Sequence, residues 1–401
     1  MKLFTKGTAL SAAMAAALAL SAGPAAAQEI KLGFLGGITG PIAAPAVHIV
    51  NAAQLAINQI NEQGGLDGRK FVMPLADTKC DSQNAVAAAN KLVNIDQVGG
   101  IAGALCSGAT ISAANAVTVK AGVTMISPSA TSPAITDLKD NDTLFRVAPS
   151  DGFQGVVLAK ALLSQGIKKV AVTYANTDYA KPLGAAFIAA FKAGGGEAAS
   201  QIHEDKKSSY RSELATLRRS GASVLVVIGY PQGSAGVILR QAIEGGLFKR
   251  FAGPEAIYDD KLWKQIGVKN LEGLLYTKPA VAKSKGAEMY EAAMKAYKPK
   301  SLGQLFTAQT YDATFITAMA LAKTGGKRDG MPAAIRSVTS EDGETIYPGE
   351  WKKAVAAIKA GKNIQYVGAS GTIVFDKNGD IAPKYDFLVL KNGKSEVLKT
   401  Y

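Results

Sequence analysis

The pattern that most constrains the fold is a regular alternation of short apolar runs and amphipathic helices. Ile30–Phe34 and Phe71–Ala76 have the length of strands, and between them Ala46–Glu62 places apolar residues at alternating spacings of four and three. Further strands are expected at Gly100–Leu105 and Val123–Ile126. This alternation predicts a doubly wound α/β lobe with right-handed crossovers around a parallel sheet.

The same alternation starts again after Pro149. The strands expected in this second series are Lys169–Tyr174, Glu197–His203, Val224–Gly229, Arg250–Ala252 and Leu274–Tyr276. The helices expected between them are Gly152–Gln165, Pro182–Ala193, Tyr210–Ser220 and Ser234–Gly245. The second series therefore predicts a second Rossmann-like lobe.

The rest of the chain is expected to return to the first lobe and then to cross again. Lys278-Pro279 is interpreted as the return crossing. Three expected helices then follow without strand partners and should complete the first lobe: Gly286–Tyr297, Ala308–Lys323 and Met331–Ser337. In the tail, Gly371–Phe375 and Phe387–Leu390 are expected to form a hairpin that turns at Asn378-Gly379.

Length and these crossings together divide the chain into two lobes. A chain of 401 residues is too long for one compact core. We assign residues 28–147 and 278–368 to lobe 1, and residues 148–277 and 369–401 to lobe 2. Two lobes joined by several crossover strands can open and close around a ligand held between them.

Residues 1–27 have the features of a secretory signal peptide. Lys2 and Lys6 give a basic start, Ala9–Leu20 is apolar, and Ala25–Ala27 offers a cleavage site. The apolar run is shorter than the roughly 20 residues that a membrane span needs. We therefore expect cleavage after Ala27 and export to the periplasm, without a lipid anchor because no Cys lies near the cleavage point.

Charge and motifs exclude several classes of function. The net charge of +13 is spread along the chain without an arginine-rich or aromatic-interleaved motif, so we expect no nucleic-acid partner. The two histidines, His48 and His203, are far apart, and the chain has no G-x-S-x-G elbow. Gly33–Gly40 lacks the spacing of a dinucleotide loop, and Asp376–Asp380 lacks that of a calcium loop. We predict no catalytic residue, cofactor or metal site, and we expect a monomer.

The two cysteines are expected to form a disulfide. Cys80 follows the strand Phe71–Asp77, and Cys106 follows the strand that ends at Leu105. Neighbouring parallel strands would bring these ends together in a chain that is exported to an oxidising compartment. Two buried free thiols are the alternative.

Two small, hydroxyl-rich loops follow strands of the first lobe and form the candidate binding site. They are Cys106–Thr110 and Ser127–Thr131. A helix is expected to begin near Ser107, so its free N–H groups and positive dipole end would face the first loop. A carboxylate suits such a place, and open α/β sheets bind ligands at this edge. A simple helix-capping role for the hydroxyl groups is the alternative.

These loops and two further segments resemble the branched-chain amino acid binding proteins of bacterial ABC importers. The segments are Cys106–Thr110, Ile126–Pro133, Gly33–Pro41 (GFLGGITGP) and Tyr366–Asp380 (YVGASGTIVFDKNGD). The resemblance covers nearly the whole chain after residue 27 and implies a type I periplasmic binding protein fold. It also implies a ligand in the interlobe cleft, an ABC permease as partner, and a disulfide between Cys80 and Cys106.

The resemblance also implies roles for individual residues. Ser107 would hold the α-carboxylate of an amino acid, the Ser129 carbonyl would accept from its ammonium, and Thr131 would contact both groups, with Ala130 beside them. From lobe 2, Glu255 would pair with the ammonium. The aromatic residues expected to close over the ligand are Tyr179 and Tyr230. The chemistry agrees, because a zwitterion needs donors at one end and acceptors at the other.

One position departs from the family pattern, and so the sequence does not decide the identity of the ligand. Pro45 stands where the family commonly has an aromatic residue against the ligand side chain. An aliphatic amino acid is the ligand that we expect, and an aryl carboxylate or another small acid is the alternative. A ligand sensor for a signalling partner is a third possibility, although the chain carries no output domain.

Overall fold

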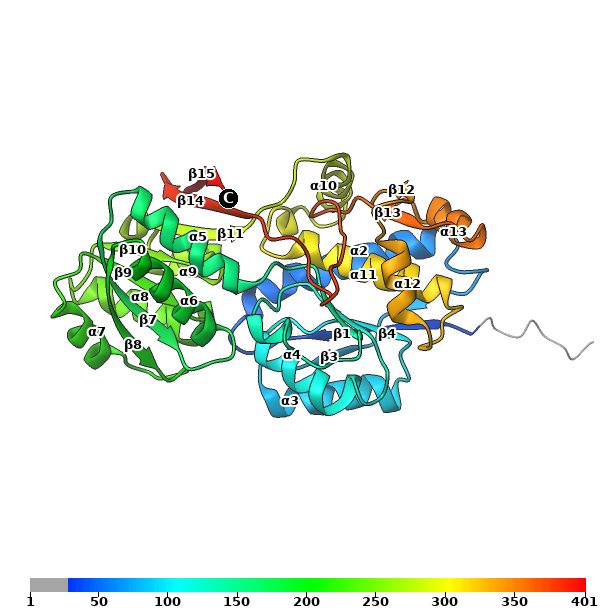
Figure 1. The fold of residues 1–401 in the computed structure, drawn as a ribbon, viewed down its shortest axis with the longest axis horizontal. Coiled ribbons are helices and arrows are strands. Elements are labelled where there is room, and N and C mark those ends of the chain that lie inside the picture. The colour runs from blue at the N-terminus through cyan, green and yellow to red at the C-terminus, as the bar shows by residue number, and fades with distance from the viewer. Residues whose placement is uncertain (1–27) are drawn as a thin grey trace, which may run out of the picture.

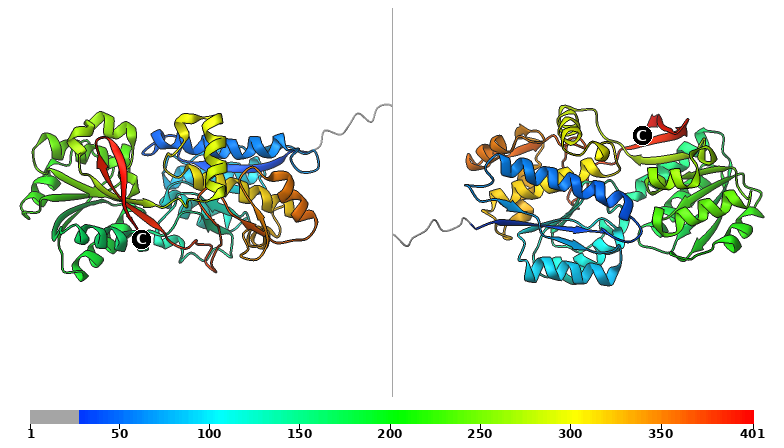
Figure 2. Two further views of the ribbon diagram at one scale, coloured as in Figure 1. Left: turned by 90° about the horizontal axis from the view of Figure 1, so that it is seen from above. Right: turned by 180° about the vertical axis from the view of Figure 1, so that it is seen from behind.

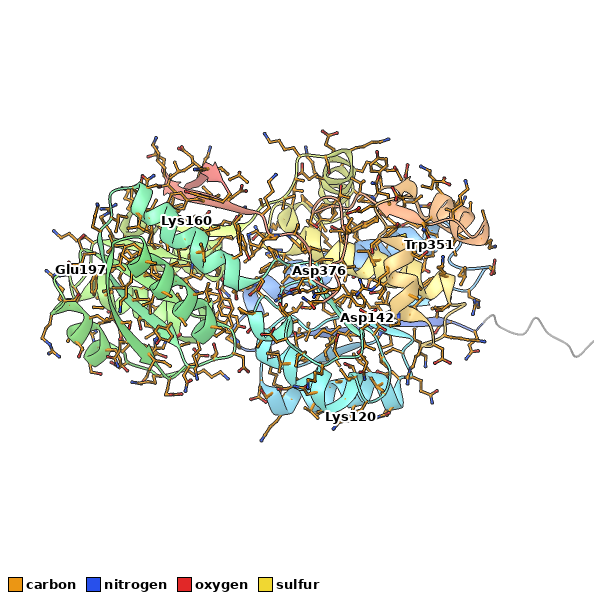
Figure 3. All side chains as sticks on the ribbon, in the orientation of Figure 1. Lys120, Asp142, Lys160, Glu197, Trp351 and Asp376 are labelled. Carbon is orange, nitrogen blue, oxygen red and sulfur yellow. A yellow bond between two sulfur atoms is a disulfide. The ribbon has the colours of Figure 1, made fainter. Side chains whose placement is uncertain are left out.

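The computed structural model describes residues 28–401, which form two α/β lobes side by side (Figure 1). The expected signal peptide and its cleavage site lie outside the described residues. Within residues 28–401, no helix combines the length and apolar character needed to span a membrane. In Figure 3, Glu197 and Trp351 mark the outer parts of the two lobes, and Asp376 lies between them.

Lobe 1 is built on a parallel sheet with the order β2-β1-β4-β5-β6, in which β3 also pairs with β1. Its strands are β1 (Ile30–Gly36), β2 (Phe71–Val72), β3 (Leu75–Asp77), β4 (Gly100–Gly103), β5 (Met125–Ser127) and β6 (Leu144–Arg146). The single strand expected over Phe71–Ala76 is therefore two short strands. Pro74 separates them because it has no N–H to donate to the ladder.

Helices cover both faces of the lobe 1 sheet (Figure 1). They are α2 (Ala43–Glu62), α3 (Ser82–Asn90), α4 (Ser107–Ala113), α10 (Lys285–Tyr297), α11 (Thr307–Lys323), α12 (Met331–Val338) and α13 (Trp351–Lys359). The late helices α10 to α12 pack into the lobe 1 core, which confirms that they complete this lobe. The sequence analysis missed α13 and a small sheet of β12 (Glu344–Ile346) and β13 (Ile364–Tyr366).

Lobe 2 contains a sheet with the order β15-β14-β11-β10-β9-β7-β8, parallel except at β14 and β15. Its strands are β7 (Lys169–Ala175), β8 (Glu197–His203), β9 (Val224–Ile228), β10 (Arg250–Gly253), β11 (Leu275–Pro279), β14 (Tyr385–Lys391) and β15 (Lys394–Thr400). Its helices are α5 (Asp151–Ser164), α6 (Ala180–Ala193), α7 (Arg211–Arg218), α8 (Gly236–Glu244) and α9 (Asp260–Ile266). Helices α5 and α6 cover one face, and α7, α8 and α9 cover the other.

The chain crosses between the lobes after β6, after β11 and before β14, and the crossings are bonded to one another. The Tyr385 hydroxyl donates to the Pro149 carbonyl at 3.0 Å. The Ala280 amide donates to the Lys384 carbonyl at 2.9 Å. Figure 2 shows the red C-terminal segment running from one lobe to the other. The third crossing is therefore hydrogen-bonded to each of the other two.

The prediction of a hairpin between Gly371–Phe375 and Phe387–Leu390 is wrong. The hairpin in the structure pairs β14 with β15 and turns near Asn392-Gly393. Residues 371–375 form no named strand. The tail contains two Asn-Gly pairs, and the second one makes the hairpin. The sequence analysis missed β15 because this strand is exposed along its whole length and so lacks the apolar alternation that marks a strand.

A buried carboxylate holds the loop after β13, and Ile373 and Phe375 further along this loop still pack into the lobe 1 core. Asp312 in α11 accepts hydrogen bonds from the Tyr366 hydroxyl at 2.9 Å and from the Ala369 amide at 2.7 Å. The Ser370 amide and hydroxyl donate to its second oxygen at 2.8 and 2.6 Å. Burial raises the pKa of Asp312 to about 6, although these four donors favour the ionised form.

The disulfide is present between Cys80 and Cys106, whose Cα atoms are 5.4 Å apart. It joins the loop after β3 to the residue before α4, and neither cysteine is free. The expected disulfide is therefore confirmed, but the strands that precede the two cysteines are not neighbours, because β3 and β4 both pair with β1, which lies between them. The bond fixes the loop from which α4 begins.

Replacing Asp312 by asparagine should destabilise the protein, because the amide nitrogen that takes the place of one oxygen cannot accept and two of the four donors lose their acceptor. We expect Asp312→Asn to lower the free energy of unfolding by roughly 2–3 kcal/mol at neutral pH, measured by urea denaturation. The raised pKa makes the contribution of this carboxyl largest below the unfolded value of 3.8 and smaller as the pH rises through about 6. The exposed Asp329→Asn is the control, and equal stability of the two variants would contradict the expectation.

Removing the disulfide should lower stability through the entropy of the unfolded chain. The bond closes a loop of 26 residues. In the loop-entropy description, Cys80→Ser combined with Cys106→Ser should lower the free energy of unfolding by about 3.5 kcal/mol. Denaturation under oxidising conditions measures this loss. A double variant as stable as the parent would show that the bond adds nothing.

Candidate functional site

The carboxyl ends of β4 and β5 carry the two predicted hydroxyl-rich loops, and hydrogen bonds tie these loops together. The Ser127 hydroxyl donates to the Ala104 carbonyl at 2.6 Å, and the Ser129 hydroxyl donates to the Leu105 carbonyl at 2.8 Å. The Ser107 hydroxyl oxygen accepts from the Ser132 amide at 3.2 Å. Because this bond uses an oxygen lone pair, the hydrogen of the Ser107 hydroxyl is still available to a ligand.

A buried arginine supports the second loop from beneath. Arg146, in β6, donates to the Ser132 carbonyl at 2.8 Å and to the Thr136 hydroxyl at 2.7 Å. Its guanidinium also binds both carboxylate oxygens of Asp380, at 2.5 and 2.9 Å. The turn at Asp376–Asp380 therefore anchors the loop that carries Ser129, through a charge-assisted bidentate pair.

Lobe 2 presents Glu255 just after β10, at the carboxyl edge of its own sheet. Its side chain is buried, and its two oxygens accept from the Tyr179 hydroxyl at 2.8 Å and from the Gln154 amide at 2.6 Å. Burial raises the pKa of Glu255, and these two hydrogen bonds partly oppose the shift. A carboxylate in this position favours a cationic partner.

Tyr179 and Tyr230 form the aromatic part of the lobe 2 surface. They follow β7 and β9, and their rings stack with centroids 5.0 Å apart and planes 15° apart. Burial raises the pKa of the Tyr230 hydroxyl, while a backbone hydrogen bond with Ser107 lowers it. Tyr230 also packs against the hydrophobic core of lobe 1, so a lobe 2 side chain contacts lobe 1 directly.

A cavity lies between the lobes and brings together four of the predicted ligand residues. Ser129, Tyr179, Tyr230 and Glu255 line it. Its apolar wall is formed by Ile42, Pro45, Ile49, Leu105, Pro231, Ala256, Leu305 and Phe306, with Tyr258 beside them. Ser107, Ala130 and Thr131 are buried in the adjoining loops and do not line the cavity.

The sequence analysis missed Asp151, the first residue of α5. Its side chain is buried, and one oxygen accepts from the Thr131 hydroxyl at 2.7 Å. Burial raises the pKa of Asp151 most, and the negative charge of the nearby Glu255 raises it further. In sequence, an acidic residue at this position indicates only a helix N-terminus.

The sequence profile of the family described as "Periplasmic binding protein" matches residues 29–387. The Leu/Ile/Val-binding protein homolog 3 of Brucella melitensis is 28% identical over 92% of this chain and 94% of its own length. The leucine-, isoleucine-, valine-, threonine-, and alanine-binding protein of Pseudomonas aeruginosa is 30% identical over 79% of this chain and 84% of its own length.

Solved structures show the same fold. The leucine-binding protein LivK from Thermotoga maritima superposes with a TM-score of 0.78 at 23% identity, over 92% of this chain and 98% of that protein. A solute-binding protein of an ABC transporter from R. palustris, in complex with benzoate, gives 0.76 at 18% identity, over 93% and 96%. The chain therefore belongs to the branched-chain amino acid binding family of type I periplasmic binding proteins.

Proposed function

We propose that this protein captures an aliphatic amino acid between its lobes and delivers it to the permease of an ABC importer. The observation that carries the proposal is the buried Glu255 carboxylate, which faces an otherwise largely apolar cavity. Relatives named as Leu/Ile/Val-binding proteins support the ligand class. Export to the periplasm after cleavage behind Ala27, and action as a monomer, belong to the same proposal.

The two ends of an amino acid zwitterion have matching groups on opposite lobes. The start of α4 at Ser107 offers backbone N–H groups to a carboxylate, and Cys106 directly before it lines the cavity together with Tyr230. Glu255 and the carbonyl of Ser129 offer oxygen acceptors to the ammonium. A ligand that contacts both lobes makes more contacts in the closed arrangement than in the open one. Binding therefore shifts the equilibrium toward the closed arrangement.

The cavity wall supports an aliphatic side chain. Ile42, Ile49 and Leu305 supply branched apolar surface, and Pro45 lies among them where an aromatic residue is common in the family. A proline leaves more room than an aromatic ring and offers no polar group. The wall therefore suits leucine, isoleucine or valine.

An aryl carboxylate is the second candidate, and the stacked tyrosines favour it. Tyr179 and Tyr230 present a flat aromatic surface to the cavity. The solved structure with benzoate shows that the fold accommodates such acids. However, an acid without an ammonium would leave the buried Glu255 carboxylate unpaired, which is costly.

A contact at the edge of the cleft supports closure as part of the mechanism. Gln232, from lobe 2, donates its backbone N–H to the Pro41 carbonyl at 3.1 Å, and its side-chain oxygen accepts from the Ala44 amide at 3.4 Å. The amide nitrogen of Gln232 donates to Asp259 at 2.7 Å. The other oxygen of Asp259 caps α9 through the Leu262 amide. This interlobe latch joins the start of α2 to the start of α9.

Glu255→Gln should weaken amino acid binding because it keeps the shape of the side chain and removes its charge. We expect the parent protein to bind leucine, isoleucine or valine in isothermal titration calorimetry. The variant should raise the dissociation constant at least about thirtyfold. The exposed Glu341→Gln serves as the matched control. Preference of the parent for benzoate, or unchanged affinity in Glu255→Gln, would overturn the proposal.

Gln232→Ala should speed ligand release because it removes the side-chain part of the interlobe latch. We expect the dissociation rate, measured by stopped-flow fluorescence, to rise roughly threefold to tenfold while association changes little. Gln83→Ala on the exposed surface of α3 should leave both rates unchanged. If Gln232→Ala behaves like Gln83→Ala, the latch does not contribute to closure.

A further inference from the structure

A second cavity lies next to the cavity between the lobes and shares part of its wall. This accessory cavity is bounded by Lys278 and Pro279 at the end of β11, by Tyr290 of α10, and by residues 302–309 before and within α11. Its volume is about 190 Å³, several times the roughly 30 Å³ that one water molecule occupies. Leu305 and Phe306 line both cavities, so an occupant of one would contact the wall of the other.

Lys278 brings a half-buried cation to the accessory cavity. Its ammonium lies over the Tyr258 ring, 5.4 Å from the ring centroid. Burial lowers the pKa of Lys278, and the carboxylate of Asp386 opposes this only in part. Asp386, which pairs with Lys278 across β11 and β14, already accepts from the Thr400 hydroxyl at 2.6 Å. The ammonium has therefore lost hydration that the chain does not fully replace, and an anion beside it would be favourable.

The Tyr290 hydroxyl is a second donor in the same cavity. Tyr290 is buried, and its hydroxyl has no hydrogen-bond partner among residues 28–401. Burial raises the pKa of this hydroxyl, so it stays protonated and can donate. Thr307, which also acts on that pKa, donates its own hydrogen to the Gln304 carbonyl at 2.8 Å. A buried hydroxyl without a partner is unfavourable, so an acceptor in the cavity would stabilise it.

The rest of the wall is mostly apolar. Leu302, Leu305 and Phe306 supply hydrophobic surface, and Val281, on the crossing after β11, is an exposed hydrophobic residue at the same cavity. Glu291, one residue after Tyr290, is exposed and also lines it. The cavity therefore combines two donors, an apolar surface and one exposed carboxylate.

We infer that the accessory cavity is a second binding site, for a small carboxylic acid with an aliphatic body. The Lys278 ammonium and the Tyr290 hydroxyl would both donate to the carboxylate, and a hydrogen bond from a cation to a carboxylate is among the strong ones. The apolar wall would cover the aliphatic part. This site lies beyond the proposed function and does not depend on it, because Glu255 and Ser129 do not line the accessory cavity.

The test uses 4-methylpentanoate and leucine, which share an aliphatic body and a carboxylate and differ in the amino group. Each acid is titrated separately into the parent protein and into the variants by calorimetry. Lys278→Met removes the cation and should raise the dissociation constant at the accessory cavity roughly tenfold to a hundredfold, the range of a lost hydrogen bond to a charged group. Tyr290→Phe removes only the hydroxyl and should raise it roughly threefold to tenfold.

Two further variants identify the cavity that is being measured. Lys283→Met changes an exposed lysine of the same connection and should leave both acids unaffected. Glu255→Gln alters the cavity between the lobes and should leave the Lys278-dependent binding in place. Circular dichroism melting of each unliganded variant checks that it is folded.

The amino group of leucine tests the role of Glu291. If the site favours amino acids, leucine should bind there more tightly than 4-methylpentanoate, and Glu291→Gln should abolish the difference. If the site favours simple acids, Glu291→Gln should leave 4-methylpentanoate binding unchanged or stronger. Either result supports a carboxylic acid site and names its ligand.

The outcomes separate this inference from the proposed function. The inference is overturned if neither acid shows binding that Lys278→Met and Tyr290→Phe weaken. It is also overturned if all binding depends on Glu255 and none on Lys278, because the acids then occupy only the cavity between the lobes. If Lys278-dependent binding is present but no amino acid binds in a Glu255-dependent manner, the inference stands and the proposed function fails.

Discussion

The two lobes meet around two buried carboxylates, those of Glu255 and Asp151. Glu255 follows a strand of lobe 2, and Asp151 begins the first helix after the crossing. Both are buried, and the neighbouring Arg146 is already paired with Asp380. Burying a charge without a partner costs several kcal/mol, so a closed and empty cleft is unfavourable. A ligand ammonium removes this cost, and the same interaction can therefore drive closure and select the ligand.

A disulfide and several hydrogen bonds within the chain hold the lobe 1 half of the site. The Cys80–Cys106 bond fixes the approach to α4, and hydrogen bonds from Ser127 and Ser129 fasten the second loop to the first. Arg146 holds the same loop from below. A site ordered in advance loses less conformational entropy on binding. The movement is then left to the hinge, where three bonded crossings connect the lobes.

The sequence predicted the features that depend on local pattern. The β–α alternation identified the two lobes, and the hydroxyl-rich loops lie at the carboxyl edge where they were expected. The sequence did not reveal Arg146, because its partner Asp380 is 234 positions away and buried arginine has no local signature. The sequence did not identify Asp151 as a site residue, because acidic residues are common at helix N-termini for electrostatic reasons alone. The two Asn-Gly pairs of the tail have equal turn propensity, and tertiary packing decides between them.

The fold alone does not decide which acid such a protein binds. A leucine-binding protein and a solute-binding protein in complex with benzoate superpose on this chain about equally well, with TM-scores of 0.78 and 0.76. Both kinds of ligand present a carboxylate, and a helix start such as that at Ser107 serves either. The difference must therefore come from the opposite end of the cavity. There, an ammonium and an aromatic ring make opposite electrostatic demands, and in the proposed site the buried Glu255 carboxylate suits only the ammonium.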